Sequence, residues 1–187
     1  MYFVLKQDTP PMIGGQRASL NGPLSVRTTA YTHSESDHLA YGRQTAIGSQ
    51  LRYGSIRSAA ADWSRFPLGT KFRIRGQPTV LYEVDDYGSA LVGTNTIDLY
   101  CPTRGMMNHW GVRNVDIEVV QWGSYSRSAD IMKSRVHYAH VRRMLNDINL
   151  RNLVQIEAQQ QQSPTGRYVK RPSSNVGPLR SPYLAMF

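Results

Sequence analysis

A chain of 187 residues is long enough for one domain plus appendages, and folding would bury about two thirds of its unfolded surface. Its 22 Lys and Arg outnumber its 13 Asp and Glu, and the formal net charge of +9 favours a polyanionic neighbour without choosing among nucleic acid, anionic lipid and cell wall. The single cysteine, Cys101, excludes an intrachain disulfide and a thiol-rich metal site, so we expect it to pack as a small hydrophobic residue.

Residues 1–24 contain several Pro and Gly pairs, which interrupt regular structure and predict an extended arm with at most a short edge strand from Tyr2 to Leu5. The apolar run at its start is too short for a signal peptide or a membrane anchor. Residues 25–123 then alternate short β-prone runs with Gly and Pro turns, which predicts a small barrel or sandwich. The predicted strands cover residues 26–32, 71–74, 79–84, 97–100 and 115–120.

A short helix is predicted between Pro102 and Gly111, since proline suits a first helical position and glycine suits a C-terminal cap. In residues 124–162, apolar side chains recur at intervals of three and four, which predicts one long helix from about Ala129 to about Gln160. Its apolar stripe favours packing against the barrel or against a second copy of the chain, as in a homodimer, over contact with a membrane surface.

Residues 163–187 carry basic side chains and no acidic one. We expect a disordered basic tail that binds an anionic envelope polymer loosely. The polar run from Thr32 to His38 holds His33, Glu35, Asp37 and His38, but contiguous polar residues are more typical of a loop than of a metal site. No metal and no cofactor are therefore predicted.

Two carboxylates, Asp86 and Asp98, flank a loop that contains Gly88 and Gly93. Carboxylates are depleted from strands, so Asp98 in its β-prone tetrapeptide either points to solvent or is held in a cleft for chemistry. A sheltered carboxylic acid keeps its proton closer to neutral pH and can donate it to a glycosidic oxygen. We expect Asp85 to face solvent, and the two glycines to turn with positive φ or to approach a sugar closely.

Six fragments in a specific order carry a resemblance to a known family. They are Thr28-Thr-Ala-Tyr-Thr32, Ala60-Ala-Asp62, Phe66-Pro-Leu-Gly-Thr70, Asp86-Tyr-Gly-Ser-Ala90, Ile97-Asp-Leu-Tyr100 and Trp110-Gly-Val-Arg113. Together they resemble the three-aspartate (3D) domain, which is the barrel of membrane-bound lytic transglycosylase A and of small cell-wall proteins of the stationary-phase survival type. The loop from Asp86 to Asp98 is one residue longer here than in the commonest form of the motif.

This resemblance implies a mainly β fold, a six-stranded double-psi β-barrel over residues 25–123. It also implies a location in the cell envelope, with the glycan strands of peptidoglycan as partner. We therefore expect that a leader peptide has been removed or that the start of the chain is assigned at the wrong position. Asp98 would be the general acid of a lytic transglycosylase, which protonates the oxygen between two amino sugars while the 6-hydroxyl closes onto the anomeric carbon.

The resemblance gives the remaining site residues supporting roles. Asp86 would keep Asp98 protonated by like-charge repulsion, or orient it through the loop. Asp62 would be the third catalytic aspartate, although a turn aspartate that bonds its own backbone is the more frequent explanation. Tyr31, Tyr87 and Tyr100, with Tyr41 and Trp110, are candidate platforms for sugar rings, and we expect about two of these five to face the cleft.

Three other functions stay open at this point. The same barrel can be a non-catalytic module that binds or shapes the cell wall through its carboxylates. An aspartic peptidase is suggested because Asp86-Tyr-Gly-Ser-Ala90 is similar to the peptidase signature, but Tyr87 replaces the expected hydroxyl residue and the chain has no second copy of the motif. Nucleic-acid binding is the weakest of the three, because it rests on charge without an aromatic and basic motif, and no specific nucleic acid is predicted as a partner.

Overall fold

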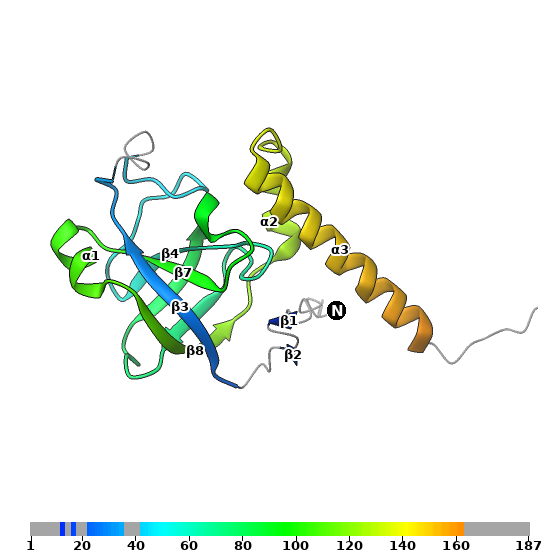
Figure 1. The fold of residues 1–187 in the computed structure, drawn as a ribbon, viewed down its shortest axis with the longest axis horizontal. Helices are drawn as coiled ribbons and strands as arrows, with labels where there is room; N and C mark the ends of the chain where they lie inside the picture. Colours follow the sequence, from blue (N-terminus) through cyan, green and yellow to red (C-terminus); the bar gives the residue numbers. More distant parts are fainter. Residues whose placement is uncertain (1–11, 14–15, 18–21, 36–41, 163–187) are drawn as a thin grey trace, which may run out of the picture.

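The computed structural model describes residues 12–13, 16–17, 22–35 and 42–162. The predicted edge strand at 2–5, the side chains of Asp37, His38 and Tyr41, and the basic tail 163–187 lie outside the described residues. Six strands close into a barrel in the order β3-β7-β4-β6-β5-β8 (Figure 1). These strands are β3 (Leu24–Tyr31), β4 (Ile56–Ala61), β5 (Lys71–Ile74), β6 (Leu81–Asp86), β7 (Thr96–Tyr100) and β8 (Arg113–Gln121). The predicted mainly β fold with a six-stranded barrel is confirmed.

The barrel mixes parallel and antiparallel pairs. β3 runs parallel to β7 and β4 runs parallel to β6, whereas the other neighbours are antiparallel. Side chains alternate along each strand, so in β5 the apolar Phe72 and Ile74 are buried while Lys71 and Arg73 are half-buried. In the N-terminal arm, β1 (Met12–Ile13) pairs with β2 (Gln16–Arg17). The Pro and Gly content of residues 1–24 did not predict this pair of strands.

Sequence reasoning missed β4. This strand reads Ile-Arg-Ser-Ala-Ala-Ala, and alanine is depleted from strands, so its propensity gave no signal. Packing explains the composition, because Ala59 and Ala61 are fully buried in the barrel core and Ala60 is nearly so on the opposite face. The small side chains let β4 pack closely between β6 and β7 in the barrel.

The short helix predicted at 102–111 is present as α1 (Arg104–Trp110). Thr103 rather than Pro102 begins it, since the Thr103 hydroxyl accepts a hydrogen bond from the Met106 amide as an N-cap. Gly111 ends it with φ +60°, as predicted. α1 covers one end of the barrel, opposite the end that faces the C-terminal helices (Figure 1).

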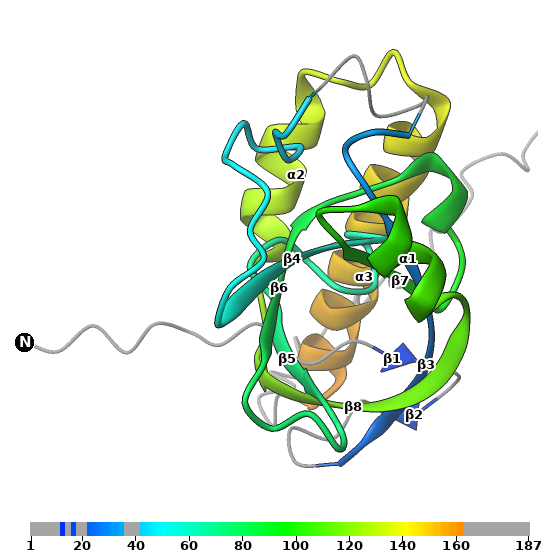
Figure 2. The ribbon, with the colours of Figure 1, turned by 90° about the vertical axis from the view of Figure 1, so that its left-hand side faces the viewer.

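The predicted long C-terminal helix is present, but the prediction that it runs unbroken from Ala129 to Gln160 is wrong. The chain forms α2 (Tyr125–Lys133) and α3 (Ala139–Gln162), separated by a turn at residues 134–138. The Ser134 hydroxyl donates to the Ile131 carbonyl, a local bond that competes with helix continuation. The two helices then pack together beside the barrel (Figure 2).

The break lets both helices contribute to the barrel core. Met132 of α2 and Val141, Met144 and Ile148 of α3 are at most 1% exposed and belong to the same apolar cluster as the barrel interior. The predicted packing of the apolar stripe against the barrel is therefore confirmed. Cys101 is buried as expected, and among the described residues no helix combines the length and apolar character needed to cross a bilayer.

Candidate functional site

A β-bulge in β6 puts two successive carboxylates on one face of the sheet. Along the parallel pair of β4 and β6, Ala59 lies opposite Val84 but Ala60 lies opposite Asp86, so Asp85 is the additional residue. Val84 points into the barrel core, while Asp85 bonds the hydroxyl of Ser58 on the other face. Bulges are frequent beside active sites because they redirect side chains in this way.

Asp98 shares that face with Asp86. Ala60 is the register partner of both residues, one on each side, so their Cα atoms are separated by two strand spacings, about 10 Å. Register partners on neighbouring strands point to the same face. The Thr29 hydroxyl, which lies opposite Asp98 on β3, donates a 2.7 Å hydrogen bond to Asp98 Oδ1. Asp86 and Asp98, which were predicted to form a pair, therefore lie on the same face of the barrel with Ala60 between them.

Accessibility separates the three predicted aspartates. Asp98 is half-buried, whereas Asp86 is 6% exposed and Asp62 is 1% exposed. Proton transfer to a polymer in solvent requires a carboxylate that the polymer can reach. Of the three, Asp98 is the one whose side chain meets this requirement.

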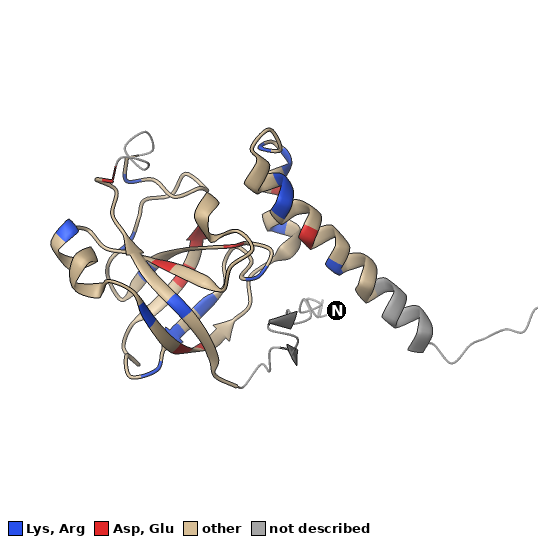
Figure 3. Ribbon diagram, in the orientation of Figure 1, with Lys and Arg blue, Asp and Glu red and all other residues tan. Residues whose placement is uncertain are grey.

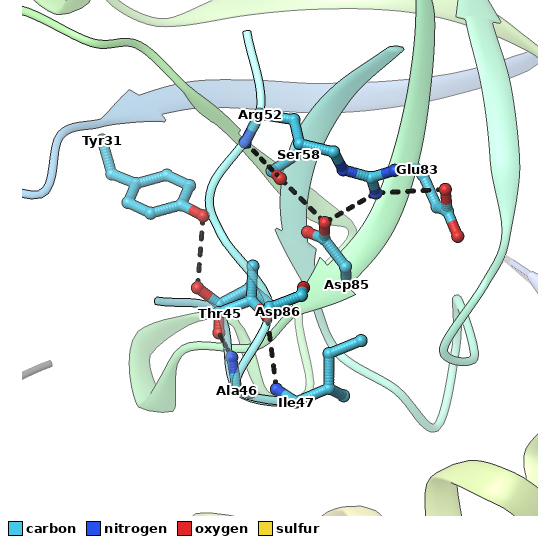
Figure 4. A network of polar contacts seen from close by, with 10 residues as sticks. Tyr31, Thr45, Ala46, Ile47, Arg52, Ser58, Glu83, Asp85 and Asp86 are labelled. Carbon is cyan, nitrogen blue, oxygen red and sulfur yellow. Dashed lines mark hydrogen bonds and ion pairs between the residues drawn. The ribbon is translucent and has the colours of Figure 1, made fainter. Parts of the chain in front are cut away.

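Asp86 is a buried acid held by three hydrogen-bond donors, two of which, Tyr31 and Ala46, are labelled in Figure 4. Its Oδ1 accepts from the amides of Ala46 (3.0 Å) and Tyr87 (2.9 Å), and its Oδ2 accepts from the Tyr31 hydroxyl at 3.2 Å. Burial is the main cause that raises the pKa of Asp86 to about 6, and the three hydrogen bonds oppose the rise. Sequence reasoning expected a raised pKa at Asp98, and the structure shows a raised pKa at Asp86.

Asp85, predicted to face solvent, is buried at 1% exposure, and that prediction is wrong. Its Oδ2 accepts from Arg52 Nη2 at 2.8 Å and from Ser58 Oγ at 2.7 Å, and the same guanidinium nitrogen bonds Glu83 at 3.1 Å (Figure 4). Burial raises the pKa of Asp85, while Ser58 and Arg52 oppose that rise. Propensity could not foresee this, because a bulge reverses the expected in-and-out alternation.

Asp62 holds a turn and a loop together. Its Oδ1 accepts from the Ser64 amide and hydroxyl, and its Oδ2 accepts from the Gly93 amide at 2.7 Å. It therefore makes the backbone bond of its own turn that sequence reasoning considered more frequent. The second bond fixes Gly93, in the loop that leads to Asp98, where φ is +81° as expected for a glycine. Gly88 differs from that expectation, because its φ is −133°, an ordinary extended value.

The three predicted tyrosine platforms occupy two different environments. Tyr31 and Tyr100 are buried with Ala60 in a small apolar cluster on the face that carries the carboxylates, and their rings meet edge to face at 5.7 Å. Tyr87 lies elsewhere, with its ring edge on Trp63 and its hydroxyl bonded by Arg135 from the turn after α2. Tyr87 therefore joins the barrel to the helices and is not grouped with Asp98.

Residues of the polar run 32–38 stabilise the same region. His33 Nδ1 is 2.9 Å from the Tyr100 hydroxyl, and Glu35 accepts from the Thr32 amide. Across the residues that the structure describes, no group of three or more His, Cys, Asp and Glu side chains is arranged to hold a metal ion. Basic residues gather instead around the turn between α2 and α3 (Figure 3).

Comparison with known proteins gives consistent matches. Residues 57–121 match the 3D domain family. The "Putative cell wall shaping protein YabE" of Bacillus subtilis (strain 168) is 29% identical over 114 residues, which are 60% of this chain and 26% of that protein. The "Cell wall-binding protein YocH" of the same organism is 31% identical over 98 residues, 52% of this chain and 32% of that protein. The matched region thus spans about a quarter of the first relative and about a third of the second.

Proposed function

Because residues 57–121 carry a 3D domain, we propose that this protein binds the glycan strands of peptidoglycan and cleaves them as a lytic transglycosylase, with Asp98 as general acid and base. The observation that carries the proposal is the placement of a half-buried Asp98 beside the buried acid Asp86 on one face of the barrel. The names of both relatives refer to the cell wall, which supports an envelope location for the proposed activity.

In the proposed reaction, protonated Asp98 gives its proton to the oxygen between two amino sugars. The bond from that oxygen to the anomeric carbon breaks, and positive charge develops on the sugar ring. The 6-hydroxyl of the same sugar then attacks the anomeric carbon, and Asp98, now ionised, takes the hydroxyl proton. One product ends in a 1,6-anhydro sugar, the other carries a free hydroxyl, and no water is consumed.

Neighbouring groups support each state of Asp98. The Thr29 hydroxyl donates to Oδ1 and so favours the ionised carboxylate after the first proton transfer. Asp86 lies about two strand spacings away, and its negative charge above pH 6 favours the protonated form of a neighbouring acid. In this proposal Asp86 positions Tyr31 and the loop through Ala46, and Asp62 positions the loop at Gly93.

The test is digestion of purified peptidoglycan, with products read by mass spectrometry. The Asp98→Asn variant is expected to stay folded and to release no 1,6-anhydro products, because an amide cannot donate the proton. Asp116→Asn is a matched control, since Asp116 is also a half-buried strand aspartate, between Val115 and Ile117 of β8. Equal product from the wild type and Asp98→Asn would remove Asp98 from the mechanism.

A non-catalytic wall-binding module is the second candidate, favoured by the name of the relative that is a cell wall-binding protein. It predicts that the wild type sediments with insoluble peptidoglycan but releases no soluble fragment. Under this candidate, Asp98→Asn lowers the bound fraction, while Asp116→Asn leaves it unchanged. The digestion and sedimentation measurements together separate the two functions.

A further inference from the structure

A pocket of about 230 Å³ lies beneath α1 at one end of the barrel. Residues of β4, β6, β7 and α1 form its walls, which are mostly aromatic or apolar: Tyr53, Tyr82, Leu99, Tyr100, Met106 and Trp110. Because α1 has no buried residue, the helix covers the pocket without filling it. The volume is below the range typical of drug-sized ligands, so the pocket suits a group the size of one or two amino-acid residues.

Arg57 supplies the one Lys or Arg charge in the lining. Its side chain is half-buried, with the guanidinium carbon 4.0 Å from the centre of the Tyr53 ring and Nε donating to the Gly54 carbonyl at 3.4 Å. Within the described ranges, none of the ion pairs involves Arg57, whereas Arg52 is paired with both Glu83 and Asp85. The pocket thus presents a half-buried cation that is ion-paired to no carboxylate of the described part of the chain.

We propose that this pocket binds the C-terminal carboxylate of a short peptide that ends in a small apolar residue. A planar guanidinium matches a carboxylate through paired hydrogen bonds. The apolar last residue would contact the aromatic walls and exclude water around that pair. One guanidinium, with His109 as the other basic side chain of the lining, suits a single carboxylate, while a phosphate polymer would favour several cations along a groove.

The position of the pocket connects it to the proposed reaction, and the peptide's identity as part of peptidoglycan rests on that proposed function. Leu99, Tyr100 and Cys101 line the pocket, so its wall begins at the residue that follows Asp98. At about 3.3 Å per strand residue, Cys101 lies about 10 Å along the chain from Asp98. Glycan strands of peptidoglycan carry short peptides on their sugars. The pocket would therefore bind a peptide that is attached to the glycan strand held at Asp98.

The binding test uses the full chain and N-acetyl-D-alanyl-D-alanine, with the C-terminal amide of the same dipeptide as comparison. Isothermal calorimetry is expected to show binding of the free acid and at least about tenfold weaker binding of the amide. Arg57→Gln should lower affinity for the acid about tenfold, to the level of the amide. Arg73→Gln is the matched control, because Arg73 is also half-buried on a barrel strand and also donates Nε to a turn carbonyl.

A second variant keeps the test valid if Arg57→Gln does not fold. Gly105 lines the pocket, and a Cβ there would meet no heavy atom nearer than Thr103 Oγ1 at 4.0 Å. Gly105→Phe is therefore expected to fold, to fill the pocket and to abolish dipeptide binding. Undiminished binding by this variant would overturn the pocket assignment, and equal affinity for acid and amide would overturn the role of Arg57.

The two proposals fail in different ways. Dipeptide binding by a wild-type protein that releases no anhydro product would support the pocket and overturn the cleavage. Release of anhydro product without any dipeptide binding would overturn the pocket and leave the cleavage standing.

Discussion

Replacing Asp86 with asparagine should stabilise the protein at neutral pH and leave its stability nearly unchanged in acid. The pKa of Asp86 rises from 3.8 to about 6 on folding, with burial as the main cause. A rise of about two units at about 1.4 kcal/mol per unit corresponds to about 3 kcal/mol. Asparagine keeps an acceptor oxygen for the amides of Ala46 and Tyr87 but never carries the charge.

Proton binding determines the direction in which the stability difference between Asp86→Asn and the wild type changes with pH. Between pH 3.8 and about 6 the folded state binds more protons at Asp86 than the unfolded state, so the free energy of unfolding falls as pH rises. Protonated Asp86 stabilises the folded state. This stabilisation is fully present below the pKa that Asp86 has in the unfolded state, and it is lost as pH rises through the pKa that Asp86 has in the folded state. Asparagine does not titrate, so the variant does not lose stability in this way. Its free energy of unfolding should exceed that of the wild type by nearly zero at about pH 4 and by about 3 kcal/mol at about pH 7.5.

Urea unfolding at a series of pH values, followed by tryptophan fluorescence, measures this difference. Trp63 is a suitable reporter, since it is fully buried and its indole nitrogen donates to the Asp86 carbonyl. Asp116→Asn, at a carboxylate that is 44% exposed, is the control and should show no such trend. A stability difference between Asp86→Asn and wild type that is the same at every pH would refute the reasoning.

Three further changes test how the site is supported. Asp62→Ala should destabilise the protein by about 3 kcal/mol and speed hydrogen exchange at the Gly93 amide, because it removes the acceptor of that amide and of Ser64; unchanged exchange at Gly93 would contradict it. Gly123→Ala should cost more than about 3 kcal/mol in urea unfolding, since its Cβ would lie 2.3 Å from the carbonyl oxygens of Pro67 and Leu68, whereas Gly54→Ala, with open space around it, should cost little. Met144→Ala should cost about 2 to 5 kcal/mol and raise hydrogen exchange in α2 and α3, because Met144 is fully buried against the barrel; protection equal to wild type would show that another contact holds the helices.

The sequence predicted five of the six barrel strands, because those segments are short runs of β-prone residues between Gly and Pro turns. It also predicted that Asp86 and Asp98 lie together, since their motifs resemble one family. β4 escaped detection because its alanines fit a crowded position in the sheet and carry little propensity of their own. The break between α2 and α3 escaped because apolar periodicity continues across residues 134–138 even though the backbone does not.

One structural feature explains why sequence reasoning missed these site residues. Asp85, Ser58 and Arg52 meet because a bulge adds one residue to β6, and a bulge leaves no pattern in a single sequence. The adjacent pair Asp85-Asp86 was the available signal, since two carboxylates in succession cannot alternate between core and solvent without one being buried.

In the proposed reaction, the bulge also separates two tasks that one carboxylate could not perform together. A positioning acid benefits from burial, because a fixed environment holds Tyr31 and Ala46 in place, and Asp86 has that environment. A proton donor to a polymer needs access, and Asp98 keeps it on the neighbouring side of Ala60. Moving Asp86 by one residue along β6 would turn it toward the core and break the contact with Tyr31. The register shift between Ala59 and Ala60 is therefore the local feature on which the proposed chemistry depends.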